Sequence, residues 1–149
     1  MIKINKKATL EQLEIVKIEF RLTQNQMDKY DNISAKIKTW AVTLWGASIG
    51  WALQTKNKEI LLVGLFVSIA FWIIDAVNKN FRTNYKIRRG QISDALQSYF
   101  KTGEWPKNFT CPELPPIRDL EMIGTVFKPH LFLFYVSLFI IGVLMYLAI

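Results

Sequence analysis

The residues best suited to bind a ligand form a basic cluster in the middle of the chain. Five basic side chains occur here with two aromatic ones among them: Lys79, Arg82, Lys86, Arg88 and Arg89, with Phe81 and Tyr85. All the basic residues except Arg88 follow helical spacing along one broad face. Guanidinium groups match phosphate oxygens, and aromatic rings stack on bases. The cluster therefore predicts contacts to a nucleotide second messenger or a phospholipid headgroup; the simpler alternative is basic charge that only fixes membrane orientation.

A second residue with chemical potential is Asp75, which lies inside the apolar run Ile60–Val77. An acid in such a run is costly unless it is paired or hydrated. Two explanations are open. Asp75 could pair with a lysine near the end of the run (Lys36, Lys38 or Lys79), or it could line a polar pathway between subunits.

The usual catalytic sets are missing from the sequence. It has no paired carboxylates in a plausible cleft, no Ser, His and Asp set, no glycine-rich phosphate loop and no zinc-ligand spacing. His130 is the only histidine, and the single cysteine, Cys111, excludes an intrachain disulfide. We therefore expect no enzyme, no metal, and no cofactor other than the nucleotide considered above. We also do not expect DNA as a partner, because the net charge of +7 is better explained by contact with anionic lipid.

Three apolar blocks must position these residues: Thr39–Leu53, Ile60–Val77 and Leu131–Ile149. A helix rises about 1.5 Å per residue and a bilayer core is about 30 Å thick, so each block is near the length needed to cross. The link Gln54–Glu59 allows only a tight reversal. The blocks predict an all-α multipass membrane protein in which the first two form a hairpin. A soluble helical bundle is the less favoured alternative, because the last block has no charge.

The distribution of lysine and arginine predicts the orientation. These residues lie mostly before Thr39 or between Lys79 and Lys128, and only Lys56 and Lys58 lie in the link. Because cytoplasmic segments carry the excess of positive charge, we expect the N-terminus and the long middle segment in the cytoplasm. The hairpin tip and the C-terminus then face outward.

The chain is expected to divide into five segments. These are a cytoplasmic amphipathic helix (1–38), a transmembrane hairpin (39–78), a cytoplasmic basic helix (79–103), a proline-rich loop with a short interfacial helix (104–129), and a C-terminal transmembrane helix (130–149). The hairpin returns both of its ends to one side, so the two cytoplasmic helices are expected to pair as a coiled-coil stalk. The alternative for the first helix is to lie flat on the membrane.

Small residues four apart occur in both segments of the hairpin. They are Gly46 and Gly50 in the first, and Gly64 and Ser68 in the second. Residues at this spacing share a helix face and let another backbone approach closely. They predict either contacts between copies in a homo-oligomer or packing within the hairpin.

The order of these elements resembles a known family. Met27–Trp40 enters the hairpin and Asp75–Leu96 leaves it, within a matching region Leu10–Phe100. This arrangement is similar to the SLATT-type membrane effectors of bacterial antiviral systems, which pair a cytoplasmic helix, a two-span hairpin and a second cytoplasmic helix. The third span and the proline-rich loop depart from that pattern.

The resemblance implies a function. It implies a homo-oligomeric effector of the bacterial inner membrane that receives a signal from a cytoplasmic sensor protein or a signalling nucleotide. Such an effector permeabilises or depolarises the membrane during phage infection, which is abortive infection. Two alternatives remain open: a non-conducting anchor that recruits a cytoplasmic defence partner, and a small channel or transporter subunit.

Overall fold

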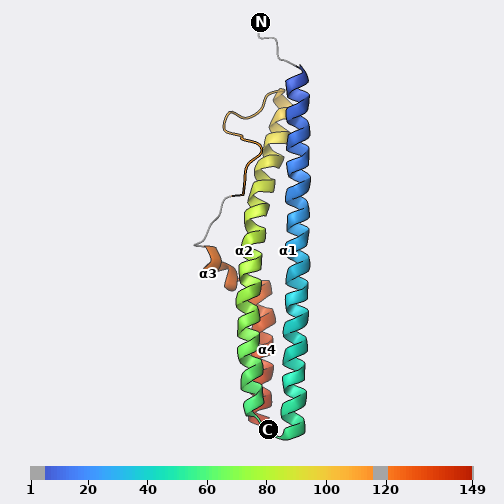
Figure 1. The fold of residues 1–149 in the computed structure, drawn as a ribbon. Helices are drawn as coiled ribbons and strands as arrows, with labels where there is room; N and C mark the ends of the chain where they lie inside the picture. The colour runs from blue at the N-terminus through green and yellow to red at the C-terminus, as the bar shows by residue number, and fades with distance from the viewer. Residues whose placement is uncertain (1–5, 116–120, 149) are drawn as a thin grey trace. The chain divides into compact units, whose positions relative to one another are not determined.

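A computed structural model describes residues 6–115 and 121–148 of the chain (Figure 1). Every regular element in this part of the chain is an α-helix, which confirms the predicted all-α class. The helices are α1 (Lys6–Thr55), α2 (Glu59–Thr102), α3 (Glu121–Val126) and α4 (Pro129–Ala148). No glycine or proline interrupts the sequence between Lys6 and Trp45, and α1 continues without a break through the glycines that follow.

A tight turn joins α1 to α2 within the link that was predicted to reverse. Lys56 has a positive φ of 53°, and the Asn57 N–H donates to the Ala52 carbonyl at 3.2 Å. This pattern is a Schellman closure, which satisfies a carbonyl that the end of α1 leaves unpaired. The Asn57 side-chain oxygen accepts from the Glu59 N–H at 3.0 Å and so caps the start of α2. Asn57 therefore ends one helix and begins the next.

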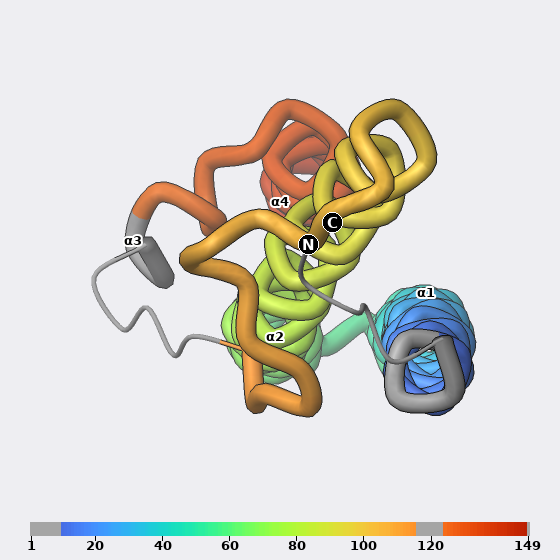
Figure 2. Tube along the Cα trace, turned by 90° about the horizontal axis from the view of Figure 1, so that it is seen from above, coloured from blue at the N-terminus to red at the C-terminus, as the bar shows by residue number. Residues whose placement is uncertain are grey.

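Gly103 ends α2 at the residue where the sequence predicted an end to regular structure. Its φ is 77°, and its N–H donates to the Tyr99 carbonyl at 2.8 Å. The following residues to 115 form a loop, in agreement with their prolines. The Trp105 ring anchors this loop, since it stacks on Tyr99 of α2 at 4.5 Å and on Phe109 at 5.7 Å between ring centroids. Figures 1 and 2 together show the loop (orange) turned back beside α2.

The chain forms two compact units. Within the described residues, unit 1 comprises 6–29 and 81–115, and unit 2 comprises 30–80 and 121–148. In unit 1, the first part of α1 packs against the last part of α2. Val16 and Met27 of α1 are buried there, as are Ile92 and Ala95 of α2. This pairing is the arrangement predicted for the two cytoplasmic helices.

Unit 2 packs parts of α1 and α2 against α4. The buried core contains Trp45, Ala41 and Leu61 from the hairpin, with Leu131 and Tyr135 from α4. The Trp45 indole N–H donates to the Leu138 carbonyl at 3.0 Å. A Cβ added at Gly142 would lie 2.9 Å from the Trp45 ring, so only glycine lets α4 approach this closely.

Within the described residues, two helices are long and apolar enough to cross a membrane, α2 and α4. Their most apolar 18-residue windows have a mean hydropathy of 2.5, and only 28% and 17% of the residues in those windows are buried inside the chain. A core helix of a soluble protein would be mostly buried. The exposed apolar side chains, such as Phe66 and Leu147, therefore need cover from outside the chain.

The first predicted span does not meet the same criterion. Its apolar stretch, Thr39–Leu53, lies within α1 and covers only about 22 Å at 1.5 Å per residue, against a bilayer core of about 30 Å. The crossing of this stretch, and with it the multipass topology, stays a prediction.

Candidate functional site

Asp75 lies at the centre of a polar cluster in unit 2 and is fully buried. The Ser34 hydroxyl donates to Asp75 Oδ1 at 2.6 Å, and the Tyr135 hydroxyl lies 3.5 Å from Oδ2. The Lys38 ammonium nitrogen is 4.0 Å from the same oxygen. α1 therefore supplies a hydroxyl and a positive charge, and α4 supplies a second hydroxyl. Of the lysines predicted as partners, Lys38 is the one that approaches Asp75.

Aromatic residues hold α4 next to this carboxylate. The Tyr135 ring stacks on Trp72 with 6.0 Å between centroids, and its hydroxyl also reaches the Phe71 carbonyl at 3.4 Å. The Trp72 indole N–H donates to the Val126 carbonyl at 3.1 Å, at the end of α3. A buried indole N–H needs such an acceptor. The side chains that cover Asp75 are thus fixed by hydrogen bonds to backbone carbonyls.

The hydrogen bonds to Asp75 leave some of its acceptor positions unused. A carboxylate has about four acceptor positions, and the short bond from Ser34 occupies one of them. The contacts from Tyr135 and Lys38 are longer and weaker. Across residues 6–115 and 121–148, no three His, Cys, Asp or Glu side chains gather as a group that could hold a metal ion. A role for Asp75 in a pathway between copies stays a prediction.

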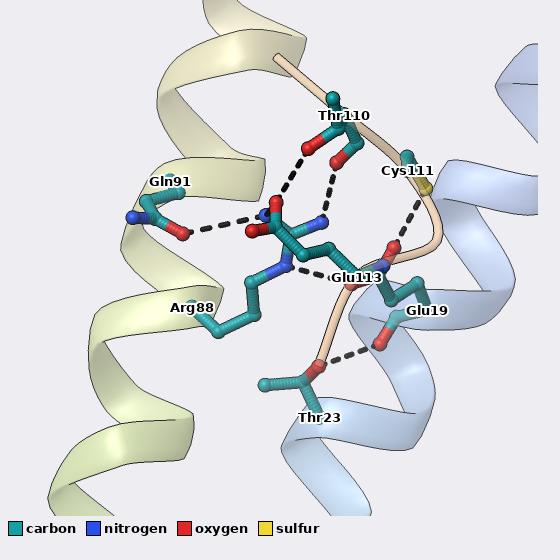
Figure 3. A network of polar contacts seen from close by, with 7 residues as sticks. All are labelled: Glu19, Thr23, Arg88, Gln91, Thr110, Cys111 and Glu113. Atoms are coloured by element: carbon teal, nitrogen blue, oxygen red, sulfur yellow. Dashed lines mark hydrogen bonds and ion pairs between the residues drawn. The ribbon is translucent and has the colours of Figure 1, made fainter. Parts of the chain in front are cut away.

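Arg88 of the predicted basic cluster is buried in unit 1 and committed to other residues of the chain (Figure 3). Its Nε donates to Glu19 Oε1 at 2.7 Å, and its Nη2 donates to the Thr110 carbonyl at 2.7 Å. Its Nη1 donates to Glu113 Oε2 at 3.2 Å and to Gln91 Oε1 at 3.3 Å. The guanidinium therefore ties α1, α2 and the loop together.

Cys111 belongs to the same network. Its thiol donates to Glu19 Oε2 at 2.6 Å. Burial, together with the hydrogen bond and negative charge of Glu19, raises the pKa of the Cys111 thiol to about 12. Burial alone would raise the pKa of Glu19, but the hydrogen bonds from Arg88 and Cys111 and the Arg88 charge lower it below its ordinary value. At neutral pH the site is therefore a carboxylate that accepts from a guanidinium and a protonated thiol.

The five predicted basic residues all lie on α2, but their surroundings differ. Lys79 belongs to unit 2, where its ammonium nitrogen lies 2.8 Å from Asp31 Oδ1. The other four belong to unit 1, where Lys86 is exposed and Arg82 is partly buried. The Arg89 guanidinium carbon lies 5.4 Å from the centre of the Phe20 ring. Contacts of these residues with phosphate stay a prediction.

The predicted packing residues fall into two groups. A Cβ added at Gly46 or Gly50 would meet nothing within 4 Å, so these exposed glycines do not serve packing inside the chain. A Cβ at Gly64 would lie 2.9 Å from the Ser48 Cβ, and the buried Ser68 hydroxyl donates to the Gly64 carbonyl at 2.9 Å. Gly64 thus packs against α1 within the hairpin, and Ser68 is buried in unit 2 beside Tyr135 and Phe139 of α4. Contacts between copies remain a prediction for Gly46 and Gly50.

Two groups were missed in the sequence because they are distant along the chain: the acid that pairs with Arg88, and the thiol that donates to this acid. Glu19 lies 69 residues before Arg88, and Cys111 lies 92 residues after Glu19. Helical spacing offered one signal, because Arg88 lies roughly a third of a turn away from the centre of the face that the other basic residues share. A basic residue that faces the partner helix requires an acid there.

No protein-family model, curated protein or solved structure matches the chain.

Proposed function

We propose that the protein is an oligomeric effector of the bacterial inner membrane that permeabilises or depolarises this membrane in response to a cytoplasmic signal during phage infection. The observation that carries the proposal is Asp75, a buried acid within α2, which is apolar enough to cross a membrane. An ionisable group at membrane depth is costly and is usually kept for function. The resemblance to SLATT-type effectors supplies the biological setting.

The proposed topology has three spans. The hairpin supplies two spans, Thr39–Leu53 of α1 and the apolar run Ile60–Val77 of α2. α4 crosses as the third span, with its C-terminal end outward. The basic residues of unit 1 then lie in the cytoplasm, as the positive-inside bias favours. A stretch as short as Thr39–Leu53 can cross if flanking polar side chains extend to the interface or the bilayer thins locally.

The contacts of Asp75 suggest how a pathway opens. Tyr135 of α4 covers the carboxylate through a contact of 3.5 Å, at the outer limit of hydrogen bonding. The hydrogen bond of the Trp45 indole to the Leu138 carbonyl holds α4 more firmly, because an indole N–H left buried without an acceptor costs about 1–3 kcal/mol. Displacement of α4 therefore needs replacement contacts, which a second copy can provide. Asp75 of each copy would then face a shared polar pathway.

The exposed glycines of α1 provide a surface for assembly. Gly46 and Gly50 lie four residues apart with open space before them. In lipid, where apolar side chains gain little by leaving the solvent, close backbone contact at small residues is a main source of helix association. We assign this face to the contact between copies.

The test is a measurement of membrane potential in bacterial cells that express the chain from an inducible promoter, with and without phage challenge. A voltage-sensitive dye should report depolarisation for the wild type and less for Asp75→Asn. Asp28→Asn is the matched control, because it removes one acid from an exposed position of α1. An unchanged potential under every condition, with the chain present in the membrane fraction, would refute the proposal.

A second candidate function is a non-conducting anchor for a cytoplasmic partner. Phe100 and Leu114 favour it, because both are large apolar side chains that unit 1 leaves largely exposed. The two functions separate when residues 1–38 and 79–129 are tethered to the membrane by an unrelated span. Retained protection against phage would favour the anchor, and lost protection would favour the effector.

A further inference from the structure

A cavity of about 460 Å³ opens in unit 1 between α2 and the loop that follows it. This volume lies in the range of sites for small ligands. α2 contributes Arg88, Gln91 and Asp94 to its wall, and the loop contributes Asn108, Phe109 and Glu113. The walls thus combine charged groups, amides and an aromatic ring.

The guanidinium in this wall has little capacity left for an anion. Arg88 already donates to two carboxylates, an amide oxygen and a backbone carbonyl. A phosphate could bind it only by displacing one of these partners, and the displaced carboxylate would remain nearby. Like charges at such a distance oppose binding.

The carboxylates in the wall, in contrast, have oxygen atoms that can still accept hydrogen bonds. Asp94 is exposed and forms no hydrogen bond or ion pair with another side chain in the described part of the chain. Glu113 uses Oε2 for Arg88 and Thr110. Among the described side chains of this network and wall, three carboxylates (Glu19, Asp94 and Glu113) stand against the single guanidinium of Arg88. The cavity is therefore locally acidic in a chain whose net charge is +7.

We propose that this cavity binds a ligand that carries a guanidinium or ammonium group, with the positive group against Asp94 and Glu113. Phe109 provides an apolar wall for an alkyl chain, and the Asn108 amide can complete the hydrogen bonds of the ligand. The positive group can belong to a small amine or to an arginine or lysine side chain of another protein. Either source has the same chemistry at the site.

The location of the cavity suggests what the ligand does. Glu113 also joins the loop to Arg88 through an ion pair. A cation that binds Glu113 therefore competes with Arg88 for one of the contacts that hold the loop to α2. In that respect the inference rests on the proposed function and assigns a class of signal to it. Binding itself requires no membrane leak, so the two proposals fail in separate experiments.

The experiment is isothermal titration calorimetry on the full chain in detergent micelles. The probes are agmatine, which has a guanidinium and an ammonium group, and a pentapeptide with one arginine between glycines; inorganic diphosphate is the anionic comparison. Asp94→Asn removes one carboxylate of the wall that forms no hydrogen bond or ion pair with another described side chain. Glu11→Gln is the matched control, because it removes an exposed acid of α1 that lies outside the cavity.

We expect the wild type and Glu11→Gln to bind at least one cationic probe with equal affinity, and Asp94→Asn to bind it about tenfold more weakly. Tighter binding of the peptide indicates a protein side chain as the source, and tighter binding of agmatine indicates a small amine. No binding of either probe to the wild type would overturn the proposal. Equal affinity in Asp94→Asn, or tighter binding of diphosphate, would also overturn it.

Discussion

Replacement of Arg88 by methionine should release the loop from unit 1. The Arg88 and Glu19 side chains are 3% and 12% exposed, so their ion pair is buried. Loss of one partner from a buried pair costs about 3–5 kcal/mol, because the remaining charge is left uncompensated. Glu19 keeps the thiol of Cys111 as a donor, which places the expected cost at the lower end, about 3 kcal/mol. That cost increases the population of the released loop about a hundredfold.

Limited proteolysis measures this population. Lys107 is an exposed trypsin site within the loop, and cleavage there follows the open fraction when opening is faster than cleavage. Lys86→Met is the matched control, since it removes one positive charge from an exposed position of the same helix. Arg88→Met should be cut after Lys107 about a hundredfold faster than the control. Equal rates would refute the assignment of Arg88 as the residue that holds the loop.

Three further predictions follow from the same contacts. Glu19→Gln should speed alkylation of Cys111 by iodoacetamide at pH 8, because it removes the negative charge that helps to raise the pKa of this thiol. A thiol whose pKa is about 12 has a thiolate population about a thousandfold smaller than that of an ordinary cysteine. An unchanged rate would contradict the contact between Glu19 and Cys111. The pKa of Glu19 is lowered in the folded state, so its stabilisation is present above the unfolded-state pKa of about 4.3 and is lost as the pH falls through the lower folded-state pKa. Cys111 should therefore react faster with dithiodipyridine as the pH falls through this folded-state pKa, and this increase should be absent in Glu19→Gln. Gly50→Leu should reduce cross-linking between copies without unfolding the chain, because its Cβ would meet nothing within 4 Å. Gly64→Leu should instead destabilise the hairpin, since its Cβ would lie 2.9 Å from that of Ser48. Identical effects of the two substitutions would contradict the assignment of Gly50 to contacts between copies and of Gly64 to packing within the hairpin.

The helices could be predicted from the sequence because their ends depend on local chemistry. Gly103 can adopt the positive φ that closes α2, and the prolines after it prevent a further long helix. The polar link before Ile60 contains Asn57, which is suited to close one helix and cap another. The length of the apolar part of α1 was the weaker point, because about 22 Å of helix falls short of a bilayer core.

The sites were less predictable because they depend on contacts between distant residues. Asp75 was recognisable as a single acid in an apolar run, but its partners Ser34 and Tyr135 come from two other helices. Arg88 was grouped with its basic neighbours, although helical spacing already set it apart from them. Neither the acid-lined cavity nor the thiol contact of Glu19 leaves a local pattern in the sequence, since the loop must fold back on α2 to form them.

The most direct test of the account is the side of the membrane on which labelled positions lie. In a Cys111→Ser background, single cysteines at Lys58, in the hairpin link, and at Lys86, in α2, are treated with a membrane-impermeant maleimide in spheroplasts with an intact inner membrane. The account predicts labelling at 58 from outside, and labelling at 86 only after the membrane is opened. Labelling of both positions from the same side, or a chain that stays in the aqueous fraction without detergent, would contradict it.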